Sequence, residues 1–304
     1  MIPKLDIIIV NWNSGTLLSE CIGSINKAIQ HSFILNKVVV IDNASSDNSL
    51  ENLDTTNLPL TIIRNTQNHG FAKACNQGAK NSKVDFLLFL NPDTHLFQNS
   101  LSEPISFMVK EENQGIGIIG VQIINEKNKI SRTCSRFPNL YRMIYMSLGL
   151  DRIFPKVFPG HFVNEWDHAD SRIVDQVMGS FFLVRKTLFE KLNGFDERFF
   201  VYYEDLDFSL RLKENGFQSY YLSTAKIYHK GGGTSEKVKA VRLSYILRSK
   251  LLFCKKHFSA LSFLLILLVT IIIEPFARII GALMKGSYQE ITEILKGYKK
   301  LIFK

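Results

Sequence analysis

The sequence contains few of the features that define several common protein classes. Its four cysteines lie far apart and form no C-x-x-C pair, so neither a zinc site nor a disulfide framework is expected. We interpret Cys21, Cys75, Cys134 and Cys254 as reduced thiols of a cytosolic protein. The apolar run at the N-terminus is short and soon returns to polar residues, which is not the pattern of a signal peptide. The main body is therefore not expected to be exported.

Two nucleotide-binding fingerprints are also missing. No G-x-G-x-x-G follows the first apolar run, and no G-x-x-x-x-G-K-[ST] occurs in the 304 residues. The body of the chain has no basic groove interleaved with aromatic residues, so we expect no nucleic-acid partner. These absences argue against a dinucleotide-binding enzyme with the usual fingerprint, a P-loop NTPase and a nucleic-acid-binding protein.

Excess positive charge is confined to one end of the chain. Residues 226–304 contain 15 Lys or Arg against 4 Asp or Glu, whereas the first 225 residues contain 22 basic and 24 acidic residues. The net charge of +9 is therefore a property of the tail. A basic, apolar-rich end predicts attachment to an anionic membrane surface, with a solvated basic face as the alternative.

The first 130 residues contain a regular alternation of apolar runs and amphipathic segments. Strands are predicted at 5–10, 38–41, 60–63 and 85–90, and helices after residue 15 and over 71–80. Short apolar strands separated by helices predict a parallel sheet covered on both faces, which is an α/β doubly wound fold. In such sheets, ligands bind beyond the carboxyl ends of the strands.

Polar residues follow each of these four strands. In chain order they are Asn11, Trp12 and Asn13, then Asp42 and Asn43, then Arg64 and Asn65, then Asn91 and Asp93. One such turn alone is typical of a helix cap, but four at one sheet edge predict a binding site. Asp42 is placed to accept from the N3 proton of a pyrimidine, with the surface near Trp12 covering the base. Asp93 is a candidate ligand for Mg²⁺ or Mn²⁺.

A second group of candidates lies between residues 179 and 233. Strands are predicted at 179–184 and 220–228, and helices at 186–193 and 204–215. Glu204 and Asp205 fall in the first turn of a helix, where the dipole favours acids, and Asp205 is a candidate general base. Asp207 is expected to face solvent or a local partner. His229, just before three glycines that could let a loop close, is a candidate metal ligand.

Together these residues resemble glycosyltransferase family 2, the inverting GT-A enzymes, and within it the bacterial rhamnosyltransferase-like branch. The resemblance covers about residues 4–235 and lies in IIIVNWNSGTLLSECIGSI, VVVIDNASSDNS, NHGFAKACNQGAK, FLLFLNPDTHL, GSFFLVRK, GFDERFFVYYEDLDFSLRLKENG and IYHKGG, in this order. It implies a GT-A fold, a Rossmann-like, mostly parallel sheet with helices on both faces. Residues 1–130 would be the nucleotide-sugar half, residues 131–235 the acceptor half and residues 236–304 a helical, membrane-associated tail.

The resemblance also implies a role for each candidate residue. The donor pocket would contain Asn11, Trp12, Asn13, Asp42 and Asn43, together with Asn68, Gly70 and Asn76, and Arg64 and Lys73 are looser candidates for its diphosphate. Asn91-Pro92-Asp93 stands where the family has D-x-D. Asn91 replaces the first Asp, which often contacts the ribose or sugar of the donor, and Asp93 with His229 would bind the metal. Gly179 matches a glycine beside the acceptor. Asp205 would be the base, and Glu204 its acidic neighbour.

The mechanism implied is a single in-line displacement, in which Asp205 deprotonates a sugar hydroxyl and the configuration inverts. The expected donor is dTDP-β-L-rhamnose, with UDP-galactofuranose or a UDP-hexose as alternatives. The expected acceptor is a saccharide or lipid-linked saccharide of bacterial surface polysaccharide synthesis, at the cytoplasmic face of the cell membrane. A catalytically inactive nucleotide-sugar-binding protein stays open as a different class.

The tail contains an uncharged apolar run at residues 258–273, which is about 24 Å of helix and short of a usual membrane span. We expect Glu274, Pro275 and Arg278 to interrupt any extension of this helix, with Glu274 and Arg278 pairing four residues apart. Three interpretations stay open: a helix in the cytosolic leaflet, a short spanning helix, and a buried core or dimer helix through which the chain could oligomerise.

Overall fold

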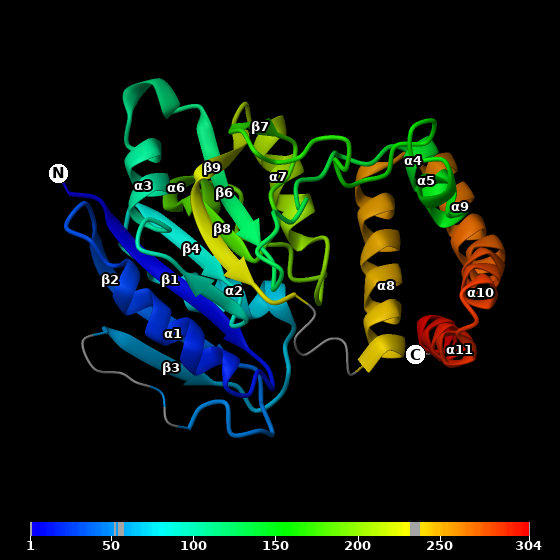
Figure 1. Cartoon of the computed structure of the whole chain (residues 1–304), viewed down its shortest axis with the longest axis horizontal. Coiled ribbons are helices and arrows are strands. Elements are labelled where there is room, and N and C mark those ends of the chain that lie inside the picture. The colour runs from blue at the N-terminus through cyan, green and yellow to red at the C-terminus, as the bar shows by residue number, and fades with distance from the viewer. Residues whose placement is uncertain (1, 52, 54–57, 232–237, 304) are drawn as a thin grey trace.

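The computed structural model describes residues 2–51, 53, 58–231 and 238–303. Its larger part is a nine-stranded sheet with helices on both faces, and its smaller part is a set of C-terminal helices beside it (Figure 1). The strands are β1 (Lys4–Asn11), β2 (Ile34–Asp42), β3 (Leu60–Arg64), β4 (Phe86–Leu90), β5 (Thr94–Leu96), β6 (Ile116–Ile124), β7 (Arg172–Val174), β8 (Phe181–Arg185) and β9 (Gln218–His229).

The sheet order is β3-β2-β1-β4-β8-β6-β9-β5, with β7 added to β9. The first four strands run parallel, and β6 is parallel to β9. Strand β8 is antiparallel to both β4 and β6, and the short strands β5 and β7 are antiparallel to β9. The expected mostly parallel sheet is confirmed, and its four N-terminal strands end at one edge.

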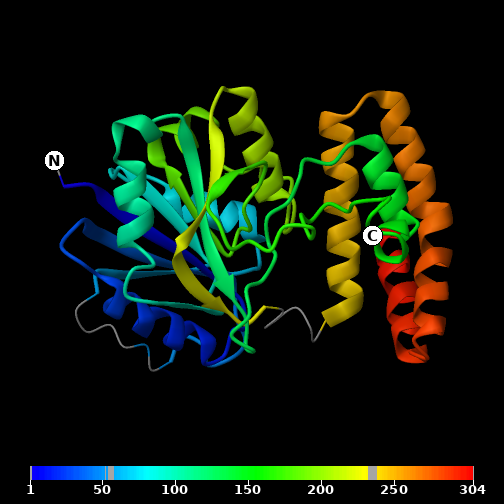
Figure 2. The ribbon, with the colours of Figure 1, turned by 45° about the horizontal axis from the view of Figure 1, so that its top comes forward.

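Helices cover the two faces of the sheet in separate layers. Helices α1 (Leu17–Ala28) and α3 (Ser102–Met108) bury their apolar side chains against one face. The other face is covered by α2 (Phe71–Ala79), α6 (Lys186–Lys191) and α7 (Glu204–Glu214). The doubly wound arrangement inferred from the sequence is therefore confirmed (Figure 2).

The C-terminal helices stand to one side of the sheet, and α8 (Lys239–His257) lies between the sheet and the others (Figures 1 and 2). The remaining helices are α9 (Ala260–Leu268), the π-helical segment η3 (Val269–Ile273), α10 (Glu274–Met284) and α11 (Tyr288–Ile302). Two short helices from the middle of the chain, α4 (Leu140–Ser147) and α5 (Leu150–Ile153), lie beside α9. We call α8 to α11 the C-terminal bundle.

The expectation that the apolar helix is interrupted at residues 274–278 is wrong. The helix continues from Ala260 to Met284, and by length and composition it is long and apolar enough to cross a membrane. Pro275 is tolerated because it lies in the first turn of α10, directly after the π-helical segment. Glu274 does pair with Arg278, and it also binds the buried ammonium of Lys250 on α8.

All four cysteines are free thiols, and all four are buried. Burial raises the pKa of the Cys21 and Cys254 thiols to about 12. The native thiols are therefore neutral and enclosed.

Candidate active site

The ends of β1 and β2 form a buried polar cluster. Because Asn11 lies opposite Asp42 in the parallel ladder, its side-chain amide donates to Asp42 Oδ1 at 2.8 Å. The same amide donates to Ser49 Oγ at 2.8 Å and to Ser45 Oγ at 3.1 Å. Asp42 Oδ2 accepts from the Ser45 backbone N–H at 3.2 Å. Each carboxylate oxygen can accept more than one hydrogen bond, so Asp42 retains capacity for a ligand.

The loops after β1 and β2 are bound to each other. Asn13, with a left-handed φ of 52°, accepts from the Ser46 backbone N–H at 2.7 Å, and its own N–H donates to Ser45 Oγ at 3.0 Å. Trp12 is half-buried between Asn11 and Asn13. These contacts bring together the first two groups of residues expected at the donor pocket.

Asn43 connects this cluster to the start of α2. Its side-chain amide donates to Gly70 O at 3.0 Å and its oxygen accepts from Asn65 at 2.9 Å, while the Gly70 N–H donates to Asn68 Oδ1 at 2.8 Å. Gly70 has a φ of +84°, and a Cβ there would overlap the carbonyl oxygen of Phe200. Only glycine fits this position.

Asn76, Arg64 and Lys73 are the remaining residues expected at the donor pocket. Asn76 lies against the loop that leads to α7, where it accepts from Phe195 N at 2.9 Å and donates to Phe195 O at 2.8 Å. Arg64 and Lys73 are exposed on β3 and α2, and Arg64 lies opposite Asp42 in the parallel ladder of β2 and β3. The structure therefore places Asn76 against the loop that precedes Glu204 and Asp205.

Asp93 and His229 come together although they are far apart in the sequence. Strand β5 pairs with β9 so that Thr94 lies opposite His229, and His229 Nε2 lies 3.1 Å from Asp93 Oδ1. Neighbouring ligand atoms on an octahedral cation lie about 3.0 Å apart when each bond is about 2.1 Å, so this pair fits one divalent ion. Within the described ranges, no third His, Cys, Asp or Glu joins them. The remaining ligands would come from a substrate and water.

Asn91 turns the chain from β4 towards Asp93. Its backbone N–H donates to Ser180 O at 3.0 Å, and its carbonyl accepts from Thr94 Oγ1 at 2.7 Å. Ser180 follows Gly179, whose N–H donates to Asp205 Oδ2 at 3.0 Å. The expected metal pair and the expected base therefore lie at the same edge of the sheet, connected through Asn91, Ser180 and Gly179.

Asp205 and Glu204 begin α7 as predicted. Asp205 accepts from the backbone N–H groups of Gly179 and Leu206, and from the Gln176 side chain. Burial raises the pKa of Asp205, although these hydrogen bonds oppose the shift. Burial and the Asp205 charge raise the pKa of Glu204, whose Oε2 has no hydrogen-bond partner among the described residues. A carboxylate with a raised pKa at a helix start suits a general base.

The turn before α7 has an unusual backbone. Tyr202 and Tyr203 both have left-handed φ angles, of 68° and 70°. For residues other than glycine this conformation costs about 1–2 kcal/mol each. Strained backbone of this kind tends to occur at functional sites, where the surroundings hold it.

Asp207 is fully buried, so the part of our expectation that it faces solvent is wrong. A local partner is present, since Arg211 Nε lies 2.8 Å from Asp207 Oδ2. Its other carboxylate oxygen contacts Lys256 Nζ at 2.6 Å and His257 Nε2 at 2.8 Å, both from α8. No sequence pattern indicates these two partners, which lie about 50 residues further along the chain.

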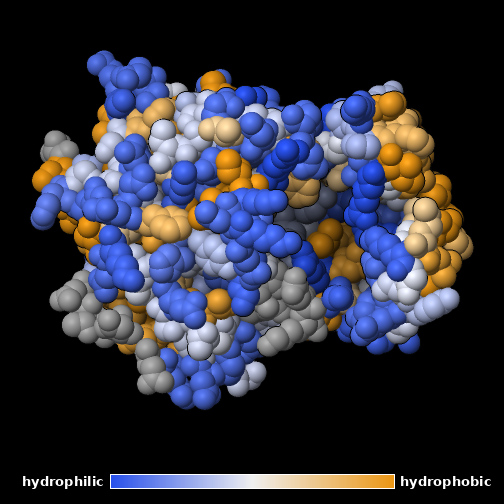
Figure 3. Space-filling view, in the orientation of Figure 1, coloured by the Kyte–Doolittle hydropathy of each residue, from blue (hydrophilic) through white to orange (hydrophobic). Residues whose placement is uncertain are grey.

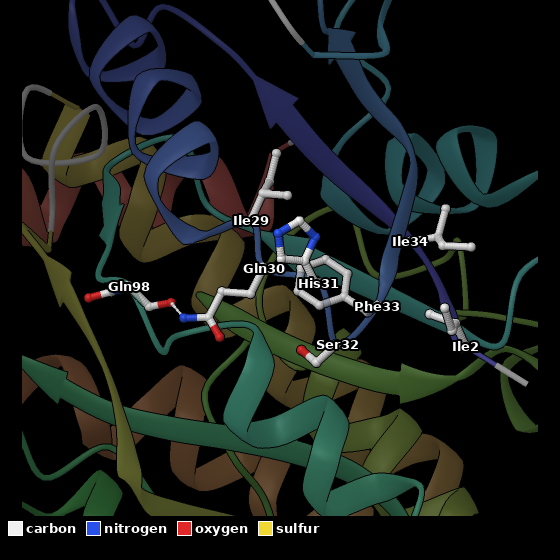
Figure 4. A pocket seen from close by; sticks show the side chains of 8 residues that line it. All are labelled: Ile2, Ile29, Gln30, His31, Ser32, Phe33, Ile34 and Gln98. Atoms are coloured by element: carbon white, nitrogen blue, oxygen red, sulfur yellow. Dashed lines mark hydrogen bonds between the residues drawn. The ribbon is translucent and has the colours of Figure 1, made fainter.

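A surface hollow lies away from these residues. It is lined by Ile2, residues 29–34 and Gln98, and the Gln30 side chain donates to Gln98 O at 2.9 Å across it (Figure 4). This position is at the amino-terminal ends of β1 and β2. The hollow contains none of the candidate site residues, which lie at the opposite, carboxyl ends of these strands.

The loop expected after His229 falls largely on residues 232–237, which lie outside the described residues. The proposed boundary near residue 235 falls there as well.

Two known glycosyltransferases are similar to this chain in sequence. The chain is 23% identical over 248 residues to the N-acetylglucosaminyl-diphospho-decaprenol L-rhamnosyltransferase of Mycobacterium tuberculosis, covering 75% of this chain and 76% of that protein. It is 31% identical over 147 residues to the rhamnosyltransferase WbbL of Escherichia coli, covering 48% of this chain and 52% of WbbL.

A solved mannosyltransferase from Pyrobaculum calidifontis, in complex with GDP-Man and Mn²⁺, has a TM-score of 0.59 with 15% identity, over 100% of this chain and 88% of that one. This similarity in fold confirms the expected GT-A fold. Residues 6–166, just over half of the chain, match the family described as Glycosyl transferase family 2. With its fold, its strand-end residues and this match in agreement, the chain belongs to glycosyl transferase family 2.

Proposed function

We propose that this chain is an inverting, metal-dependent glycosyltransferase that moves L-rhamnose from dTDP-rhamnose to a saccharide or lipid-linked saccharide acceptor in bacterial surface polysaccharide synthesis. The observation that carries the proposal is the position of Asp205 and the Asp93–His229 pair at one edge of the sheet, connected through Asn91 and Gly179. The rhamnose donor is proposed because two similar proteins are rhamnosyltransferases. Residues 1–235 would form the transferase and residues 236–304 its membrane-associated region.

The chain's own groups have separate roles in this reaction. Asp42, held by Asn11 and Ser45, accepts from the base of the nucleotide, and the loops after β1 and β2 enclose it. Asp205 takes the proton from the acceptor hydroxyl, which then attacks the anomeric carbon opposite the diphosphate. A divalent cation held by Asp93 and His229 would supply positive charge to the departing diphosphate. One displacement inverts the anomeric configuration.

Binding of the nucleotide is expected to depend on the metal and on Asp93. Calorimetric titration with dTDP, UDP and GDP, each with Mn²⁺ and then with chelator, measures this directly. We expect dTDP to bind most tightly, and the Asp93→Ala variant or chelator to weaken binding at least about tenfold, or about 1.4 kcal/mol.

Asp85→Ala is the matched control. It removes an exposed carboxylate just before β4, whereas Asp93 follows the other end of this strand. A preference for UDP would replace rhamnose by galactofuranose or a hexose as the proposed sugar. Failure of all three nucleotides to bind would overturn the donor site.

The membrane proposal rests on the outer face of the helix that runs from Ala260 to Met284. Large apolar side chains are exposed along it, and Figure 3 shows apolar residues gathered on the outer side of the bundle. In chain order these side chains are Leu261, Leu264, Leu265, Leu268, Ile272, Ile273, Phe276, Ile280, Leu283 and Met284. The interpretation of this segment as a buried core helix is therefore wrong.

The inner face of the same helix supports a position on the membrane surface instead of across it. Glu274 is buried there between Lys250 of α8 and Arg278. A spanning helix would carry this charged group and the attached α8 into the hydrocarbon layer, where charges are strongly unfavourable. The basic tail adds attraction to anionic headgroups.

Vesicle binding tests this placement. We expect the protein to sediment with vesicles that contain anionic lipid, and Leu268→Glu/Ile272→Glu to reduce the bound fraction at least about tenfold, because two charges would enter the apolar layer. Val109→Glu alters an equally exposed apolar residue after α3 and should bind as the wild type does. Equal binding by the double variant would contradict the proposal. If the wild type and Val109→Glu form dimers and the double variant is a monomer, the apolar face binds a second copy of the chain instead of lipid.

A further inference from the structure

The turn that precedes α7 lies between two elements from distant parts of the chain. On one side, the carbonyl of Phe200 accepts from the Phe71 N–H at the start of α2, at 2.6 Å. On the other side, the rings of Phe200 and Tyr245 lie 4.8 Å apart, and the Ser249 hydroxyl donates to Val201 O at 2.8 Å. Helix α8 therefore holds this turn through both a ring contact and a hydrogen bond.

Further along, α8 contacts α7 itself. The ring of Phe253 lies 5.7 Å from that of Tyr203, and Lys256 and His257 both bind Asp207. These residues recur at the three- and four-residue spacing of a single helix face, after Tyr245 and Ser249. One face of α8 thus covers the segment from Phe200 to Asp207.

The backbone that α8 covers has a conformation of high energy, which needs support from its surroundings. The left-handed conformations of Tyr202 and Tyr203 persist only where the surrounding structure holds them. Asp205 follows two residues later, and its place against the Gly179 N–H depends on the direction in which this turn leads the chain into α7. Helix α2 bonds the turn at Phe200, whereas α8 contacts Val201 and the ring of Tyr203.

We infer that α8 is a positioning element of the active site, in which Ser249 and Phe253 hold the Tyr202–Tyr203 turn and thereby set the position of Asp205. The inference rests on the proposed function, since it takes Asp205 as the base. It gives the C-terminal bundle a second role, because the helix that connects the bundle to the sheet also completes the active site. Ser249 and Phe253 act through the turn and touch no substrate.

The test compares variants in the full-length protein. Ser249→Ala/Phe253→Leu is expected to lower kcat at least about tenfold while leaving the KM for the nucleotide sugar unchanged, because Asn11 and Asp42 are held by each other and by Ser45 and Ser49. Ser249→Thr keeps the hydroxyl and is expected to keep kcat within about threefold of the wild type. Ser244→Ala is the matched control, since the Ser244 hydroxyl donates to Val241 O within α8 itself.

A second control separates positioning from general loss of stability. Ile294→Ala opens the interior of the bundle at α11 without touching the turn, and it should retain kcat at an equal loss of thermal stability. If it loses kcat as much as the double variant does, or if the double variant keeps kcat, the inference is overturned.

Amide hydrogen exchange supplies a readout that needs no activity. Exchange in residues 200–207 should accelerate in Ser249→Ala/Phe253→Leu and stay at the wild-type rate in Ile294→Ala. Unchanged protection in the double variant would overturn the inference whatever the enzyme transfers. If the double variant loses protection as expected but the wild type transfers no sugar, the proposed function is contradicted and the support of the turn by α8 is not.

Discussion

Asp205→Asn is expected to lower the rate of sugar transfer about 10²–10⁴-fold, while the Kd for the donor nucleotide stays nearly unchanged. The substitution keeps the size of the side chain and one oxygen that can accept from the Gly179 or Leu206 N–H, so the start of α7 should keep its shape. What is lost is the basic carboxylate. Single-turnover transfer and calorimetric nucleotide binding measure the two quantities separately.

The pH profile of kcat/KM gives the same residue a second readout. Burial raises the pKa of Asp205, and the base must be deprotonated to act. As the pH is lowered, kcat/KM of the wild type should therefore begin to fall at a pH higher than the pKa of an ordinary carboxyl group. The residual activity of Asp205→Asn should lack this limb. Glu214→Gln, at the exposed end of α7, is the matched control. If transfer by Asp205→Asn stays within tenfold of the wild type, Asp205 is only an acid that favours the helix start.

Asp207→Ala is expected to lower the free energy of unfolding by about 3–5 kcal/mol. The carboxylate is fully buried, and its removal leaves Arg211, Lys256 and His257 without their shared partner. Urea unfolding followed by circular dichroism measures the loss. Asp170→Ala removes an exposed carboxylate paired with Arg172 and should change stability little by comparison.

The pH dependence of this loss follows from the direction of the shift. Burial opposes ionisation, but hydrogen bonds from His257 and Lys256 together with Arg211 lower the pKa of Asp207 below its ordinary 3.8. The stabilisation is therefore present above the unfolded pKa and is lost as the pH falls through the folded one. The difference between wild type and variant should shrink only below about pH 4. If the free energies of unfolding of the wild type and Asp207→Ala differ by less than about 1 kcal/mol at pH 7, Asp207 is not the shared partner of a buried ion pair.

Most of the sheet could be predicted because its N-terminal strands are uninterrupted apolar runs. Strand β6 was not predicted, although it lies inside the sheet between β8 and β9. Glycines at 117 and 120 break its pattern, and glycine normally weakens a strand. The structure gives their reason: a Cβ at Gly117 would overlap Leu212 and Leu188, and one at Gly120 would overlap Val177. Helices and loops pack closely at both positions, which no local pattern reveals.

The candidate site could be predicted in its residue types more than in its contacts. Asp93 and His229 were expected to act together, but the β5–β9 pairing that joins them spans 136 residues of sequence. The partners of Asp207 and the support that Ser249 and Phe253 give to the turn were missed, because the sequence of α8 is typical of an ordinary basic helix. Long-range packing, which depends on where the C-terminal bundle lies, decides these contacts.

The enclosed cysteines have a practical consequence for labelling. A maleimide reacts with an exposed thiolate, and all four native thiols are buried, with Cys21 and Cys254 having pKa values of about 12. One cysteine introduced on the surface would therefore be the site that a fluorophore or spin label modifies in the folded protein, with the native sequence otherwise intact. Placed at Leu268 or at Lys255, such a probe would report how deeply each side of the bundle enters a lipid layer.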